Sequence, residues 1–162
     1  MARQGTTGIS RLWWVPAIAS ATLAPTVAEV NAGTDLTPFL TRDGFDAPQT
    51  SATIDASDAS SRVNKTIPGN IEAAKITIKA YRDSVAADDD AWAALPTDAA
   101  GFLVERPFGG SAVAVAAAQK VNVWEAVVVS RSPSSWGDEA RTFTAECSSE
   151  AHAEDLAVLA GT

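Results

Sequence analysis

The chain has 162 residues and a mass of 16.8 kDa, with twelve basic and twenty acidic side chains and a net charge of −8. This length predicts one domain, residues 1–162, that can bury a core. The acidic balance argues against a protein that holds nucleic acid tightly, because phosphate binding depends on clustered Lys and Arg. The one cysteine, Cys147, excludes an intrachain disulfide framework and any zinc site built from several cysteines.

The first twenty residues have the layout of a secretory signal, with positive charge, a short apolar run over 12–19 and small residues at 19–21. Pro16 interrupts the apolar run, and the adjacent indoles of Trp13 and Trp14 favour a strand instead. No stretch of the sequence approaches the roughly 18–20 apolar residues of a membrane span. We therefore expect a soluble protein and keep secretion as an alternative.

The segment "RLWWVPAI" (11–18) predicts the first strand. Leu12 and Trp14 share one face of this strand, and Trp13 and Val15 share the other. If the strand is regular, at most one indole can fill the chain's own core. We expect a neighbouring subunit or a folded-back segment to cover the other, because burying an indole is strongly favourable.

Three features follow along the chain. "TVAEV" after Pro25 predicts a helical turn that ends near Gly33. "DLTPFLT" predicts a short strand before a tight turn at Asp43-Gly44. From 46 to 70, Ser, Thr, Asp and Ala dominate, which predicts a long surface loop. Because a loop of about 25 residues exceeds an ordinary connection, we expect it to be functional or to become ordered against a neighbour.

The clearest strand is "ITIKAYRD", in which Ile76, Ile78 and Ala80 share one face, and a bulge is expected near Ala74. "DDDAWAALP" predicts a short helix with an aspartate at its amino-terminal cap, and Pro96 discourages its continuation. "GFLVERPF" predicts a further strand.

Two long patterns complete the chain. "QKVNVWEAVVVS" predicts a strand with Val121, Val123, Val127 and Val129 on one face, interrupted by Glu125. "RTFTAEC" alternates Phe143, Ala145 and Cys147 inward, and the intervening turn makes these two runs a hairpin. About six strands and two short helices predict a mainly β fold, an antiparallel β-sandwich or barrel with one or two short helices.

The sequence contains few candidates for catalytic, metal-binding or phosphate-binding residues. His152 is the only histidine and lies in a polar stretch, where a solvated side chain is the simpler interpretation. Asp88–Asp90 lacks the ligand spacing of a calcium loop, so helix capping explains it better. Gly109-Gly110 lacks the fingerprint of a phosphate loop. Cys147 alternates with core residues and is interpreted as a small hydrophobe.

Four glutamates fall on predicted strands and are the remaining candidates for acid–base work: Glu72, Glu105, Glu125 and Glu146. Spacing does not bring any two of them together, and solvated strand faces explain them all. We therefore expect no catalytic, cofactor-binding or metal-binding residues and no cofactor. An enzyme is not predicted.

Several segments appear in an order that points to a family. These are "RLWWVPAI", "PTVAEVNAGTDLTPFLTRDGF", "IDASDASSRVNKTIPG", "ITIKAYRD" and "DDDAWAAL", followed by "GFLVERP" and "QKVNVWEAVVVS". Their number and order resemble the major tail, or tail tube, proteins of long-tailed bacteriophages (siphoviruses), particularly those that infect actinobacteria. The resemblance covers approximately residues 11–95, with the later strands in the expected order.

The resemblance implies a structural virion protein of the tail, assembled in the host cytoplasm without membrane insertion. Its copies are expected to form hexameric rings that stack into a tube, around a tape-measure protein and joined to terminator and baseplate proteins. Duplex DNA then passes non-specifically through the lumen. In this interpretation the long loop at 46–70 bridges rings, and residues 1–9 and 149–162 are terminal arms.

An acidic lumen is a further expectation from the resemblance, and Glu72, Glu125 and Glu146 are the acidic residues on the predicted central strands. An acidic wall would let a polyanion slide, whereas a basic wall would trap it. Two alternatives stay open. One is a secreted bacterial β-sandwich binding module with a mature amino terminus near Thr22. The other is a different virion part on a related fold, such as a capsid decoration or head–tail joining protein.

Overall fold

In the computed structural model, residues 8–56, 66–72, 75–110, 112–134 and 140–160 are described. Within them lie nine strands and two short helices. In chain order these are β1 (Arg11–Val15), α1 (Val27–Ala32), β2 (Thr34–Asp35), β3 (Leu40–Asp46), β4 (Thr50–Asp55), β5 (Thr66–Glu72), β6 (Ile76–Tyr81), α2 (Asp90–Ala94), β7 (Ala100–Arg106), β8 (Lys120–Pro133) and β9 (Thr142–Ala157).

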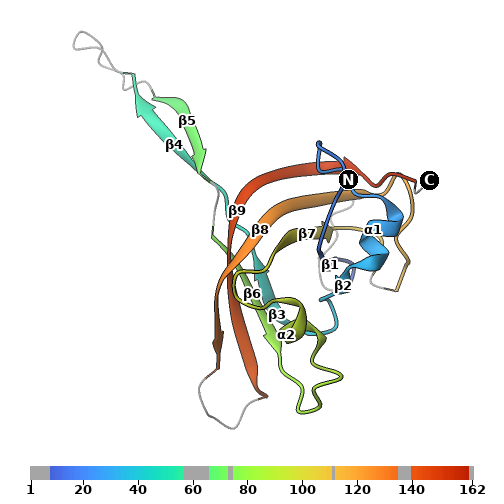
Figure 1. The fold of residues 1–162 in the computed structure, drawn as a ribbon. Coiled ribbons are helices and arrows are strands. Elements are labelled where there is room, and N and C mark those ends of the chain that lie inside the picture. The colour runs from blue at the N-terminus through green and yellow to red at the C-terminus, as the bar shows by residue number, and fades with distance from the viewer. Residues whose placement is uncertain (1–7, 57–65, 73–74, 111, 135–139, 161–162) are drawn as a thin grey trace.

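Seven strands form one antiparallel sheet in the order β2-β1-β7-β8-β9-β6-β3. The sheet curls strongly, so that β8 and β9 arch over the body (Figure 1). Leu12 of β1 and Phe45 of β3, near the two edges of the sheet, line one cavity of about 410 Å³. The predicted mainly β, antiparallel class with two short helices is confirmed, and its sheet is a single half-barrel.

Both faces of the sheet bury apolar side chains, in two separate clusters. The inner core, inside the curl, contains Trp14, Ile78, Trp124 and Phe143 and is closed by residues of α2. The second core lies on the other face and consists of Trp13, Val15, Val30, Val104, Val115, Val121, Val123 and Val158.

Of the two covers expected for the second indole, a neighbouring subunit or a folded-back segment, the structure shows the folded-back segment. Both indoles are buried within the chain itself. They point to opposite faces as predicted, but Val30 of α1 and Val158 after β9 cover the Trp13 face. The sequence of β1 has apolar side chains on both faces. Only contacts with residues distant in the sequence determine which segment covers the Trp13 face.

The predicted helical turn is confirmed as α1, and its start has a physical cause. The Thr26 hydroxyl accepts a hydrogen bond from the Glu29 amide at 3.2 Å, while the Glu29 carboxylate accepts one from the Thr26 amide at 2.7 Å. This reciprocal pair is a capping box. The hydrogen bonds from the Thr26 and Ala19 amides lower the pKa of Glu29.

The tight turn expected at Asp43-Gly44 is wrong. β3 runs through both residues, and its register with β6 shifts between Leu40 and Phe45. A side chain at Gly44 would collide with the carbonyl oxygen of Lys79. The glycine therefore serves a close approach of two strands at a bulge rather than a turn.

The long loop expected at 46–70 is instead a β-hairpin over much of its length. β4 and β5 pair antiparallel, with Ile54 opposite Ile67, and form a two-stranded sheet of their own. This hairpin projects far from the body (Figure 1). Residues 57–65 and the bulge expected near Ala74 lie outside the described residues.

The carboxyl-terminal arm expected from residue 149 is wrong for 149–157, which belong to β9 and pair with β8. Val158 is buried, and Leu159 bridges to Thr26 beside α1. The predicted hairpin of the last two strands is confirmed and is longer than expected. Of the expected amino-terminal arm, residues 1–7 lie outside the described part of the chain.

The expected cap of α2 is also different. Asp89 occupies the cap position but makes no capping hydrogen bond with its side chain. Its carboxylate instead accepts a hydrogen bond from the Arg82 guanidinium at 2.7 Å. Among the described helices, neither is long and apolar enough to span a membrane.

Candidate assembly surfaces

On one face of the sheet, none of the described residues forms a core cover over β6, the first half of β9 and the facing part of β8. Alternation on β6 sends Ile76 and Ile78 into the inner core and Thr77 and Lys79 to the opposite side. We call this surface the polar face. It comprises Asp46, Lys75, Thr77, Lys79, Glu125, Val127, Ser130, Ser132, Thr144, Glu146 and Ser148, with the exposed Val129 at the bulge beside Ser130.

The polar face is built from adjacent rows of cross-strand partners. Thr77 of β6 lies opposite Glu146 of β9, which in turn lies opposite Ser130 of β8. In the next row Lys79 lies opposite Thr144. The register shift between Val128 and Ser130 adjusts the alternation of β8 so that serines continue the face. The surface is therefore a continuous hydroxyl-rich strip of three strands.

The polar face carries charges of both signs, and Asp46 at the end of β3 adds a negative charge because it lies opposite Thr77. The Lys75 ammonium lies 2.6 Å from the Glu146 carboxylate, which also accepts a hydrogen bond from the Ser130 hydroxyl at 3.0 Å. The hydrogen bonds from Lys75 and then Ser130 lower the pKa of Glu146, more than its partial desolvation raises it. Lys79 and Glu125 add one charge of each sign. Two of the glutamates expected on an acidic wall thus share it with two lysines.

The other glutamates behave differently. The side chain of Glu72 lies outside the described residues. Glu105 lies on the inner side of β7 and accepts a hydrogen bond from the Asn122 amide at 3.0 Å. Glu105 and Glu146 therefore have separate partners on opposite sides of the sheet, and they form no acid–base pair.

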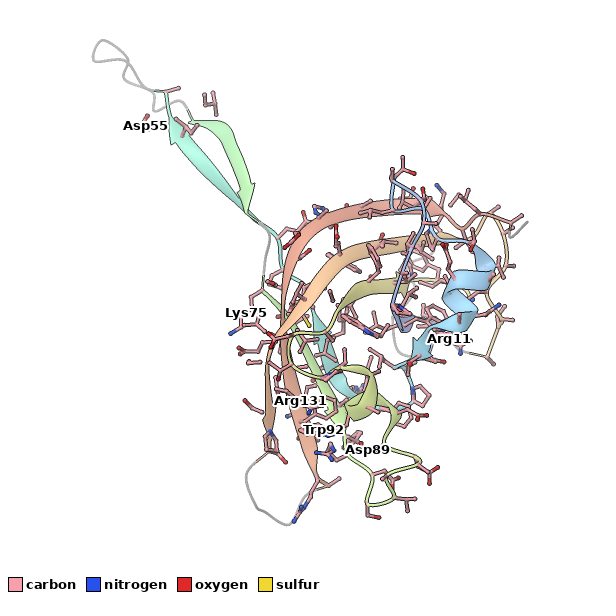
Figure 2. The ribbon with its side chains drawn as sticks, viewed as in Figure 1. Arg11, Asp55, Lys75, Asp89, Trp92 and Arg131 are labelled. Atoms are coloured by element: carbon pink, nitrogen blue, oxygen red, sulfur yellow. The ribbon has the colours of Figure 1, made fainter. Side chains whose placement is uncertain are left out.

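The hairpin is the second candidate surface. Ile54 and Ile67 are 54% and 49% exposed and face each other across the two strands. Figure 2 shows Asp55 near its outer end, far from the body. At the base, the Gln49 amide lies 2.7 Å from His152 Nε2 and 2.8 Å from a Glu154 carboxylate oxygen.

His152 is therefore a partly buried β9 residue that touches the base of the hairpin, not the solvated tail residue that was expected. No sequence signal pointed to this contact, because its two residues lie 103 positions apart. The contact ties the projecting hairpin to the body at one point.

A third surface is the loop between β7 and β8, which exposes Phe108 and Val113. Arg106 is fully buried beneath it and donates hydrogen bonds to the carbonyl oxygens of Gly110 and Ala114, at 2.6 and 3.3 Å. Burial, followed by the nearby Arg11, lowers the pKa of the Arg106 guanidinium. Gly109 and Gly110 both have positive φ, which suits glycine. The Gly-Gly pair shapes this loop.

A cluster of cations and one indole lies beside α2. Trp92 is stacked between the Arg82 and Arg131 guanidinium groups, 3.6 and 3.4 Å from its ring centre. Arg131 also donates a hydrogen bond to the Trp92 carbonyl oxygen at 2.7 Å. Figure 2 shows Asp89, Trp92 and Arg131 gathered at this end of the molecule. Asp89 balances one of the two charges, so the aspartate run is used to hold α2 on the sheet.

The remaining candidates for chemistry are a lone cysteine and possible metal-binding groups. Cys147 is buried among the inner-core residues, and burial raises its pKa to about 11, so its thiol is not an activated nucleophile. Among the described residues, no group of three His, Cys, Asp or Glu side chains is placed to hold a metal ion.

Comparison with known proteins supplies a family. The sequence model described as "Phage tail tube protein" matches residues 1–162. No curated protein matches the chain significantly. Among solved structures, a chain of the baseplate of the anti-feeding prophage, from a six-fold symmetrised cryo-EM structure, shares the fold with a TM-score of 0.60. The alignment covers 94% of this chain and 96% of that one at 9% identity.

Proposed function

Because the chain belongs to the phage tail tube protein family, we propose that its copies join side by side into hexameric rings that stack into the tail tube. The family is structural, and its members are components of the virion tail rather than enzymes. A heterologous contact closes into a ring when its rotation closes, and a second contact repeated along the ring axis builds a tube.

We propose that the polar face lines the lumen. The observation that carries this assignment is that, within the described part of the chain, neither the inner core nor the second core covers this strip of three strands. An exposed apolar strip would have to be buried by another surface, whereas hydroxyl groups and paired charges can face water. Such a strip fits the wall of a water-filled channel.

Its charge, with two lysines and three acidic residues, suits duplex DNA as cargo. DNA carries about one negative charge per 1.7 Å of axis, and a lysine-rich wall would bind it tightly. On the polar face Glu146 holds Lys75 at 2.6 Å, so that the cation is already paired. We propose that this wall avoids adhesion because its lysines lie among carboxylates, with Lys75 directly paired to Glu146.

The projecting hairpin is proposed to cross to the next ring. Two-stranded hairpins are marginally stable alone in water, and this one exposes Ile54 and Ile67. Contact with a neighbouring ring would bury both side chains. The further partners proposed, a tape-measure protein and the terminator and baseplate proteins, follow from the family. The assignment to long-tailed phages of actinobacteria rests on the resemblance of the segments over residues 11–95.

The secreted alternative conflicts with the sheet. A mature terminus near Thr22 would remove β1, whose Trp13 and Trp14 belong to the two cores. Electron microscopy of the purified chain tests the proposal. Tubes or stacked rings are expected, while dispersed monomers at high concentration would contradict it. Single rings that never stack would favour another virion part on this fold.

A further inference from the structure

A tube that repeats one contact along its axis needs two different surfaces at opposite ends of the subunit. The hairpin supplies one of them, on the proposed function. It joins the body where β6 begins, at Ile76, and β6 then runs to Tyr81 at the other end of the molecule (Figure 1). The complementary surface should therefore lie near Tyr81.

An open hollow of about 680 Å³ lies at that end. Its walls come from the segment after β6 with Arg82 and Asp83, the end of β8 with Pro133, and the start of β9 with Arg141 and Thr142. Three elements that meet at the end of the sheet thus enclose it.

Two exposed apolar residues adjoin the lining residues of this hollow in the chain, and we call them its rim. Tyr81 is 44% exposed and Val85 is 52% exposed, and they flank the lining residues in the chain. Ile54 and Ile67 of the hairpin are exposed to a similar degree. Half of the eight exposed large hydrophobic side chains in the described residues therefore lie at these two ends of the subunit.

Charge and rigidity agree with this match. The hairpin segment 46–72 carries four acidic and two basic residues, whereas the hollow is lined by two arginines and one aspartate. Arg82 is held in place by Trp92 and by its 2.7 Å ion pair with Asp89. A lining group that is fixed in advance loses little conformational freedom on binding.

We propose that this hollow is the seat for the β4–β5 hairpin of a second copy of the chain, in the adjacent ring. The apolar pair of Ile54 and Ile67 contacts the rim at Tyr81 and Val85. The acidic hairpin meets the arginines behind the rim. This inference rests on the proposed function and adds where the hairpin binds.

Paired cysteines test the seat. We would prepare the double variant Ile67→Cys with Val85→Cys, assemble tubes and oxidise them. The native Cys147 does not interfere, because it is buried and its pKa is raised to about 11. Each single variant can link chains only into dimers. The double variant should link them head to tail, giving a ladder of species larger than a dimer on a non-reducing gel. Ile54→Cys replaces Ile67→Cys if the latter weakens assembly.

The matched control is Ile67→Cys with Leu159→Cys, because Leu159 is 45% exposed but lies beside α1. It should give no ladder. Tubes that form without a ladder in the Val85 pair, or with an equal ladder in the Leu159 pair, would overturn the seat while leaving the tube function intact. Failure of the unmodified chain to form tubes would instead refute the tube function.

Discussion

The body of the molecule and its hairpin are both antiparallel β-structure, yet they differ in what stabilises them. In the body, Phe143 and Ile78 are fully buried in the inner core. In the hairpin, Ile54 and Ile67 pair only with each other and stay half exposed. The body can therefore fold by itself, whereas the hairpin gains its full stability from another copy. The chain thus combines a domain that is stable by itself with a hairpin that needs a second copy for its full stability.

Removing the hairpin should have the largest effect on assembly while leaving the folding of the body unchanged. Replacing residues 50–72 with a short Gly-Ser linker should leave the body folded, because none of its core residues is lost. Tube formation should disappear. Circular dichroism melts and electron microscopy of the same sample measure both effects. Normal tubes from this variant would refute the bridging role.

Hydrogen exchange of the backbone amides compares the stability of the hairpin with that of the body without a mutation. In isolated subunits, amides of Thr50–Asp55 and Thr66–Glu72 should exchange quickly, while those of Ile76–Tyr81 stay protected. Assembly should slow exchange in the hairpin. Equal protection of hairpin and body before assembly would mean that the hairpin does not need a partner.

A core substitution should affect the body strongly. Phe143→Ala removes a fully buried ring that packs edge-on against Trp92 at 5.1 Å, so the free energy of unfolding should fall by about 3–5 kcal/mol. Ile67→Ala in the hairpin should change it by less than about 0.5 kcal/mol, as for an exposed site. Chemical denaturation of the two isolated variants measures the difference. Similar losses in both would contradict the division into body and hairpin.

The cap of α1 should have a smaller effect on the body. Thr26→Ala removes the hydroxyl of the capping box and should cost about 1 kcal/mol, or roughly 2–4 °C in Tm. The pKa of Glu29 is lowered in the folded chain, so its contribution is present above its unfolded pKa and lost as pH falls through the folded pKa. Glu29→Gln should therefore flatten the acid side of the Tm-against-pH curve, and an unchanged curve would contradict this.

Charge reversal on the polar face should have the smallest effect on folding and assembly. Glu146→Lys alters an exposed site that no neighbour needs to cover, so tubes should still form. DNA ejection should slow, because the change unpairs Lys75 and adds a further cation, and added salt should partly restore it. Asp90→Lys, on α2 across the sheet, is the control and should do neither. Equal behaviour of both variants across a salt series would contradict the lumen assignment.

The strands that border the inner core could be predicted from the sequence. Ile76, Ile78 and Ala80 alternate with polar residues, and Phe143 and Ala145 do the same. Both sets are buried as expected, because one face of their strands is buried and the other is not.

The parts that were missed depend on contacts between distant residues. β4 and β5 lack an alternating apolar pattern, so hydrophobic periodicity does not reveal them. Asp43-Gly44 has the composition of a turn, yet the approach of Lys79 makes it a bulge. The buried Arg106 is indistinguishable in sequence from a surface cation, since only the folded loop provides its partners. The same holds for the contact of Gln49 with His152.

The central claim, that the uncovered strip of β6, β8 and β9 forms the wall of the tube, is tested most directly by a helical reconstruction of assembled tubes. We expect Lys79, Thr144 and Glu146 to face the tube axis in every subunit, with the Lys75–Glu146 pair intact. A reconstruction that places these residues on the outer surface of the tube, or beneath a neighbouring subunit, would contradict it.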